Sequence, residues 1–128
     1  MENIQTDQQP TICILAMPAD TNSDGDIFGG WIMAQVDIAG NIVATKRAQG
    51  RVVTVAIEKF VFFKPVYVGD LVSCYAKVMK VKRTSLNVTV KVFADRNRMG
   101  DAKVKVGEAM LTYVLLDKHR NPQPVPDI

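Results

Sequence analysis

The first half of the chain has the residue spacing of one long helix. Apolar side chains recur every three or four positions along one face of this segment, at Ile32, Val36, Ala39 and Val43. We expect the helix to start between residues 27 and 30, with Asp26 as its N-cap, and to end near residue 49, with Gly50 as its C-cap. Small side chains in the same segment would let this helix lie close against a sheet: Ala34, Ala39, Gly40 and Ala44.

Strand patterns account for most of the remaining chain. Runs of β-branched and aromatic residues predict strands over residues 11–17, 52–63, 71–81, 86–92 and 104–116. The fourth of these alternates apolar and polar residues, which is typical of a half-buried strand. Short connections join the last four strands and favour antiparallel pairing, because parallel neighbours need long crossovers. The sequence therefore predicts an α+β fold, with one long central helix against a curved antiparallel sheet.

The chain has the length of a single domain. Its 128 residues, 48% of them hydrophobic, can bury a real core, and a domain this small gains stability when it oligomerises. We expect a flexible N-terminus over residues 1–10 and one domain over residues 11–118. The proline-rich tail over residues 119–128 should be extended or disordered.

Composition and charge argue against several locations and partners. The N-terminus is polar and acidic, unlike a signal peptide. The apolar stretch over residues 27–44 contains Gln35, Asp37 and Asn41, which are costly in lipid. The net charge of +3 is spread along the strands and only 7% of residues are aromatic, a poor match for nucleic acid. We therefore expect a cytoplasmic protein without membrane or nucleic-acid partners, whose mildly basic surface suits a small phosphate-bearing ligand.

Metal sites and histidine-based catalysis find little support. Residues 20–25 match the opening of an EF-hand calcium loop, but the twelfth position is Trp31 instead of glutamate. The single histidine, His119, lies in a polar turn, so we expect it at the surface and outside any Ser-His-Asp or Cys-His arrangement. Cys13 and Cys74 lie in apolar stretches without metal-like spacing, and we expect buried free thiols in a reducing compartment.

Asp37 is the charged residue whose place in the pattern is hardest to explain. It lies too deep in the predicted helix to cap it, and no cation stands three or four positions away. One interpretation is that its carboxylate faces water on the outer side of the helix. The other is that it lies partly shielded among Val36, Ile38 and Ala39, where it would suit general-base chemistry. The pattern alone leaves both open.

The glycine-rich start of the helix offers a second chemical feature. Residues 25–30 form a tight turn, and free N–H groups at such a helix start also bind developing negative charge. A carboxylate about two turns further on would complete a minimal acyl-transfer site. Such a site suits a thioester, because a thiolate whose conjugate acid has a pKa near ~8.5 can leave without a general acid. An amide nitrogen would have to be protonated.

These same segments resemble the acyl-CoA hydrolase branch of the hotdog superfamily, close to the YciA-type bacterial thioesterases. The resemblance covers roughly residues 11 to 116 and is carried by residues 17–22, 25–33, 35–37, 50–55, 65–70 and 84–85. It implies the hotdog fold, in which the sheet wraps one long helix. It further implies homodimers with two sheets joined edge to edge, which assemble into hexamers as trimers of dimers.

The resemblance also implies roles for particular residues in acyl-CoA hydrolysis, at a site shared across the dimer interface. Asp37 would act as general base or nucleophile, Asn22 of the other subunit would position water or the carbonyl, and amides near Gly29 and Gly30 would polarise the thioester. The implied contacts with acyl-CoA are Phe28, Val55, Ala56, Ile57, Arg83, Thr84, Ser85 and Leu86. No cofactor is implied, because CoA is part of the substrate and product.

Two features and two alternatives qualify these roles. Residues 38–41 depart from the family pattern, which would alter the substrate tunnel and the preferred acyl chain length. Arg83 would either contact a phosphate or remain a solvated charge at a strand end. The competing functions are a hotdog dehydratase acting on a hydroxyacyl thioester, which typically needs a histidine, and a non-catalytic module that binds acyl-CoA.

Overall fold

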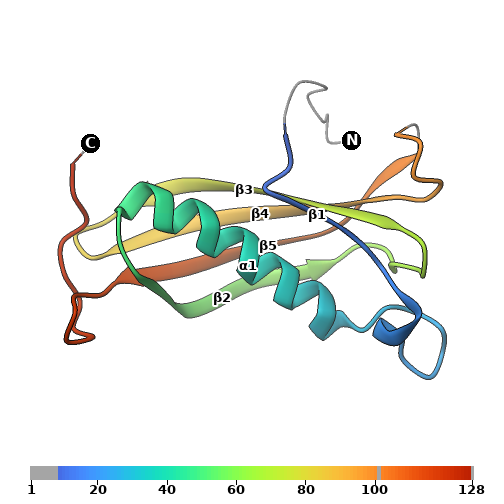
Figure 1. Ribbon diagram of the computed structural model, residues 1–128, viewed down its shortest axis with the longest axis horizontal. Helices are drawn as coiled ribbons and strands as arrows, with labels where there is room; N and C mark the ends of the chain where they lie inside the picture. Colours follow the sequence, from blue (N-terminus) through green and yellow to red (C-terminus); the bar gives the residue numbers. More distant parts are fainter. Residues whose placement is uncertain (1–8, 101, 128) are drawn as a thin grey trace.

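The computed structural model describes residues 9–100 and 102–127, and it consists of one long helix laid across a five-stranded sheet (Figure 1). The predicted flexible N-terminus falls almost entirely outside the described residues. The elements follow the predicted order along the chain: β1 (Ile12–Leu15), the short 3-10 helix η1 (Pro18–Asp20), α1 (Gly29–Ala48), β2 (Val52–Phe62), β3 (Leu71–Val81), β4 (Ser85–Asp95) and β5 (Lys103–Leu115).

The strands pair in the order β1-β3-β4-β5-β2, and every pair is antiparallel. Antiparallel pairing is confirmed, but β2 and β3 are not neighbours although a short connection joins them. Instead β2 pairs with β5 at one edge of the sheet, with register shifts between Thr54 and Ala56 and between Glu58 and Val61. The other edge of β2 has no strand beside it among the described residues.

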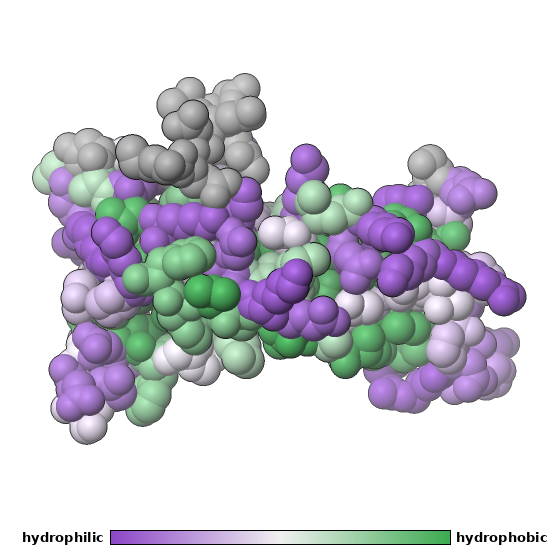
Figure 2. Space-filling model, turned by 180° about the vertical axis from the view of Figure 1, so that it is seen from behind, coloured by the Kyte–Doolittle hydropathy of each residue, from purple (hydrophilic) through white to green (hydrophobic). Residues whose placement is uncertain are grey.

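The core lies between α1 and the sheet. On β4 the residues that alternate inward are completely buried, namely Leu86, Val88, Val90 and Val92. The helix contributes Ile32, Val36 and Ala39, and Val43 packs partly buried against the core, so the predicted periodic face packs inward. The opposite face of the sheet is mixed in character (Figure 2), because Asn87 and Thr89 alternate with the core residues of β4.

The structure corrects the predicted caps of the helix. Asp26 is not the N-cap: it pairs with Tyr67 in an isolated bridge, so the chain is still extended there and Phe28 becomes the N-cap. Gly50 is not the C-cap either, because Gln49 adopts the left-handed conformation at φ 58°. A Cβ added to Gly50 would lie 2.9 Å from Leu115 Cδ1, so the end of that side chain would have to shift.

The two predicted buried cysteines differ in their exposure. Both thiols are free, but Cys13 is exposed because β1 turns it outward, whereas Cys74 is buried, which raises the pKa of its thiol to about 12.

The C-terminal tail is extended, as predicted, and it is hydrogen-bonded to the domain. Gln123 N–H donates to Leu115 O at 2.9 Å, and Val125 N–H donates to Arg83 O at 2.8 Å.

Candidate active site

Asp37 lies half-buried on α1, facing the sheet. Its Oδ1 accepts a hydrogen bond from the Thr54 hydroxyl at 2.7 Å and another from the Tyr113 hydroxyl at 2.9 Å. Its Oδ2 accepts no hydrogen bond within the described residues and stays accessible to solvent. Asp37 is therefore neither a free surface charge nor a carboxylate surrounded only by apolar groups. One oxygen is anchored and the other is open.

The register of the sheet brings the two hydroxyls together. Thr54 on β2 stands directly opposite Tyr113 on β5, so both side chains point toward the same stretch of α1. Tyr113 is completely buried, and burial, followed by its hydrogen bond with Asp37, raises the pKa of its phenol above the ordinary value. The phenol therefore remains protonated and continues to donate to the carboxylate.

Gly40 makes the approach of Tyr113 possible. A Cβ added at this position would lie 2.3 Å from the Tyr113 hydroxyl oxygen, so the buried phenol would have to shift. The phenol therefore packs directly against the helix backbone at Gly40. Its oxygen also lies 3.0 Å from the backbone oxygen of Asp37. The missing side chain at Gly40 is thus part of what positions the carboxylate.

Sequence reasoning missed Tyr113 and Thr54. A signal for Tyr113 is present, since it interrupts the otherwise aliphatic inward row of β5, formed by Ala109, Leu111 and Leu115. A buried tyrosine hydroxyl requires a hydrogen-bond partner. No signal along the chain reveals which one, because Asp37 is 76 residues away.

The start of α1 forms a second region of the candidate site. Asn22 Oδ1 accepts hydrogen bonds from the N–H groups of Asp24 and Asp26, at 2.9 and 3.1 Å, which closes the preceding loop into a turn. This turn occupies the segment that resembled a calcium loop. Nowhere in residues 9–100 and 102–127 do His, Cys, Asp or Glu side chains gather in a group that could hold a metal ion.

The amides of Gly29 and Gly30 lie in the first turn of α1. Neither N–H donates a hydrogen bond within the described residues, and a Cβ added to Gly30 would meet nothing within 4 Å. Beside them lies a pocket of about 330 Å³, lined by residues of the Asn22 loop, the helix start and the end of β2: Asn22, Asp26, Ile27, Gly29, Ile32, Phe62, Phe63, Lys64, Pro65 and Val66. The loop, the glycines and the pocket therefore form one continuous region.

Asp37 is not part of this pocket. Asp37 is eight positions after Gly29, which corresponds to about 12 Å along an α-helix. A single chain therefore brings Asn22 and Gly29 together but keeps them apart from the carboxylate. The predicted meeting of Asn22 with Asp37 across two subunits remains a prediction.

The predicted acyl-CoA contacts lie in three places. Phe28 is exposed beside the helix start, and Val55, which bulges from the β2 edge, is 55% exposed, with Ala56 and Ile57 half-buried next to it. In the turn after β3, Arg83 is exposed and Thr84 is half-buried, and Ser85, the first residue of β4, is also half-buried. The side chain of Leu86 is completely buried in the core, so the chain does not offer it to a ligand.

Two remaining predictions concern the surface. His119 is exposed in a turn, where its N–H donates to Asp117 Oδ1, so its surface position is confirmed. None of the helices in the described residues is long and apolar enough to span a membrane.

Comparison with known proteins places this architecture in a family. Residues 24–100 match the family model of the thioesterase superfamily, and the chain belongs to that superfamily. It is similar to the YciA-type members in particular. Over 114 residues it is 46% identical to the acyl-CoA thioester hydrolase YciA of Salmonella typhimurium. That alignment covers 88% of this chain and 86% of the relative. The resemblance that the motifs carry is therefore confirmed.

Solved structures agree with this assignment. A hexameric hotdog-fold thioesterase of Campylobacter jejuni superimposes with a TM-score of 0.87 at 42% identity, covering 95% of this chain and 93% of that one. An acyl-CoA hydrolase from Staphylococcus aureus, solved with butyryl coenzyme A and coenzyme A, gives a TM-score of 0.84 at 31% identity. That match covers 90% of this chain and 70% of the other. The predicted hotdog fold is confirmed.

Proposed function

We propose that this protein hydrolyses acyl-CoA to free CoA and a carboxylic acid, with Asp37 as the catalytic carboxylate. The observation that carries the proposal is the geometry of Asp37, whose Oδ1 is fixed by two hydroxyls while Oδ2 stays open. The names of the related hydrolases support acyl-CoA as the substrate class. The reaction needs no cofactor, since CoA is itself part of the substrate.

Two reaction routes use the open oxygen. As a general base, Oδ2 takes a proton from a water molecule while that water attacks the carbonyl carbon. As a nucleophile, Oδ2 attacks the carbonyl carbon itself and forms a mixed anhydride, which water then hydrolyses. In both routes the carbon–sulfur bond breaks and the CoA thiolate leaves unassisted. A single turnover in ¹⁸O-labelled water tests them: label in the Asp37 carboxylate identifies the anhydride route with water attack on the aspartyl carbonyl carbon, because the general-base route labels only the product acid.

The proposed site combines groups from two subunits. Asn22 and Gly29 line one pocket, whereas Asp37 of the same chain lies about 12 Å further along the helix. We therefore assign Asn22 and the Gly29 and Gly30 amides to one subunit and Asp37 to its partner. The amides would stabilise the negative charge that develops on the thioester oxygen, helped by the positive end of the helix dipole.

The surface beside Asp37 supports this pairing. Apolar side chains remain exposed on α1 and on the neighbouring edge strand β2, among them Met33, Ile38, Val55 and Val61. Because no strand among the described residues pairs with the outer edge of β2, a second copy could continue the sheet there. We propose a homodimer formed across this surface, three of which assemble into a hexamer as in the hexameric relative. Light scattering measures the assembly directly.

Contacts with the rest of acyl-CoA are assigned to the exposed parts of the predicted set. The irregular part of β2 at Val55, Ala56 and Ile57 is assigned to the pantetheine chain. The turn at Arg83, Thr84 and Ser85 offers a guanidinium and two hydroxyls, which suit phosphate. Phe28 stands exposed beside the amides of the helix start.

The first test is an assay of purified protein on a panel of acyl-CoA esters, with a thiol reagent to detect released CoA. Asp37→Ala and Asp37→Asn should lose at least a hundredfold in kcat, since each removes the base or nucleophile. Asp127→Asn, which changes an exposed carboxylate on the tail, is the matched control and should behave as wild type. Binding of acyl-CoA without turnover would identify a non-catalytic module instead.

A mixing experiment tests whether the site is shared. Asn22→Ala and Asp37→Ala chains are each poorly active when alone. If the two residues act across subunits, mixed dimers contain one intact site, and activity returns when the two variants are unfolded and refolded together. If both residues act within one chain, every site in the mixture keeps one defect and no activity returns.

A further inference from the structure

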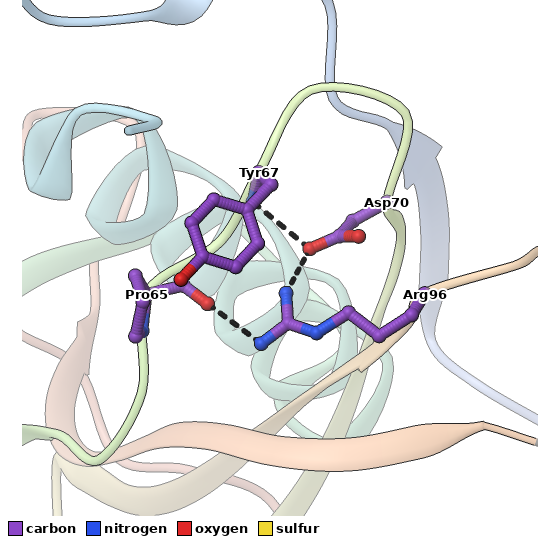
Figure 3. Close-up of polar contacts among 4 residues, drawn as sticks. All are labelled: Pro65, Tyr67, Asp70 and Arg96. Atoms are coloured by element: carbon purple, nitrogen blue, oxygen red, sulfur yellow. Dashed lines mark hydrogen bonds and ion pairs between the residues drawn. The ribbon is translucent and has the colours of Figure 1, made fainter. Parts of the chain in front are cut away.

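Arg96, the first residue after β4, holds the turn between β2 and β3 by three contacts (Figure 3). Its Nη1 donates to Asp70 Oδ2, and its Nη2 donates to the backbone oxygen of Pro65 at 3.0 Å. The guanidinium also lies over the ring of Tyr67, 4.8 Å from its centroid. Asp70 Oδ2 accepts a second hydrogen bond from Tyr67 N–H, at 2.9 Å. One side chain thus contacts the beginning, the middle and the end of residues 65–70.

Burial makes this arrangement depend on Arg96. Asp70 is only 3% exposed, and an ionised carboxylate so far from water needs a charged partner and hydrogen bonds. Arg96 provides the charge, with its own side chain 27% exposed. The ion pair is therefore partly shielded from water, and it adds a charged contact to the backbone hydrogen bonds that also hold the turn.

The same turn forms a wall of the pocket at the helix start. Pro65 and Val66 line that pocket together with Asn22 and Gly29. The turn is also bonded to the chain just before the helix. Ile27 N–H donates to Val66 O at 2.9 Å, and Asp26 pairs with Tyr67 in an antiparallel bridge.

We propose that Arg96 is a positioning residue of the thioester site. It fixes the 65–70 turn, and through Val66 and Tyr67 the turn fixes the Asn22 loop and the amides of Gly29 and Gly30. Arg96 does not line the pocket and is not a catalytic residue. The proposal rests on the proposed thioesterase function and adds a residue to it that lies outside the pocket.

The contacts require arginine rather than positive charge alone. The planar guanidinium donates from two nitrogens in fixed directions, one to Asp70 and one to Pro65, while its face covers Tyr67. A lysine could keep the ion pair with Asp70 and so preserve much of the stability. It could not also hold the Pro65 carbonyl and stack on the ring. Arg96→Lys therefore separates positioning from folding.

The experiment compares Arg96→Lys with Arg98→Lys, an equally conservative change two residues away on an exposed side chain. Both are assayed for kcat and KM with acyl-CoA well below their unfolding temperatures, with folding checked by circular dichroism. We expect Arg96→Lys to lower kcat about tenfold or more at little change in KM, because misplaced groups weaken transition-state binding. Arg98→Lys should match wild type.

Every outcome is informative. A fully folded Arg96→Lys with wild-type kcat overturns the positioning role, while the thioesterase function stands. A fall in kcat that only follows the folded fraction also overturns it. Wild-type protein that releases no CoA from any acyl-CoA ester overturns the proposed function itself. Tyr67→Leu provides a second variant, because it removes the stacked ring but leaves the ion pair, and a smaller fall in kcat is expected.

Discussion

The two ends of α1 are held by different kinds of contact. At its start, the 65–70 turn is fixed through the side chain of Arg96 and the buried carboxylate of Asp70. At its end, the β3–β4 turn is fixed by the tail, through Val125 N–H to Arg83 O, while Arg47 Nη1 donates to Pro126 O at 2.8 Å. The start therefore adds a buried ion pair, centred on one arginine, to its backbone hydrogen bonds, whereas the contacts at the end are several separate hydrogen bonds.

This difference corresponds to the role that we propose for each end. The start of the helix carries amides that must meet developing charge within a few tenths of an ångström, and a buried ion pair with fixed directions suits that demand. The end of the helix lies beside residues assigned to a flexible, largely solvated phosphate group. Distributed backbone bonds there keep the turn in place without one indispensable residue. Substitutions that remove contacts at one end of α1, or in the region between the two ends, test this difference.

Arg96→Ala should have the largest effect on stability. It leaves Asp70 buried without a charged partner, and breaking a buried pair in this way costs about 3 kcal/mol or more. Urea unfolding measures the loss, and Arg98→Ala should stay within about 0.5 kcal/mol of wild type. A loss for Arg96→Ala as small as that of the control would contradict the dependence of this end on one ion pair.

Gly40→Ala tests the region between the ends. Helix propensity alone would make alanine more stable by about 1 kcal/mol. The clash with Tyr113 should instead destabilise the protein by about 2 kcal/mol, and displacement of the phenol from Asp37 should lower kcat about tenfold. Adding Tyr113→Phe removes the nearest clashing atom and should recover part of the stability but none of the activity. A more stable Gly40→Ala would show that the phenol does not need this gap.

Truncation after Asn121 tests the end of the helix. It removes the backbone bonds to Leu115 and Arg83 and the packing of Val125, at a cost of about 1–2 kcal/mol. Since the β3–β4 turn is assigned to the phosphate end of CoA, KM should rise for acyl-CoA but not for the matching acyl-pantetheine. An equal rise for both substrates would place the effect elsewhere.

Gln123→Ala should have the smallest effect. Its Nε2 donates to Leu116 O at 3.1 Å, and loss of one such bond costs about 1 kcal/mol. The backbone bonds of the tail remain, so KM for acyl-CoA should not change. A loss as large as that of truncation, seen by thermal unfolding, would mean that this end also depends on a single side chain.

Local patterns were sufficient to predict most of the fold. Periodic apolar residues identified α1, and alternation identified β4, because both signals are contained within one segment. The caps were predicted wrongly since pairing of Asp26 with Tyr67, a contact between distant segments, extends the chain past the expected N-cap. The position of β2 beside β5 likewise depends on the whole sheet and not on the length of one connection.

The sequence pointed to the candidate residues themselves but not to the side chains that position them. Asp37 and Gly29 stood out because a carboxylate in an apolar helix and a glycine-rich helix start are unusual along the sequence itself. Thr54, Tyr113 and Arg96 did not stand out, since a threonine or tyrosine in a strand and an arginine in a turn are ordinary there. Their roles arise only from strand register and from contacts that join distant parts of the chain.

The gap at Gly40 has a consequence for anyone who redesigns this protein to withstand heat. Rules for thermostabilisation would select a mid-helix glycine as one of the first positions to replace. Here the missing side chain at Gly40 leaves room for the phenol of Tyr113 to lie against the helix. That space is needed for the phenol to donate its hydrogen bond to Asp37. A design procedure that scores the helix by itself would replace Gly40 and predict a gain in stability, although the substitution would displace Tyr113 from Asp37.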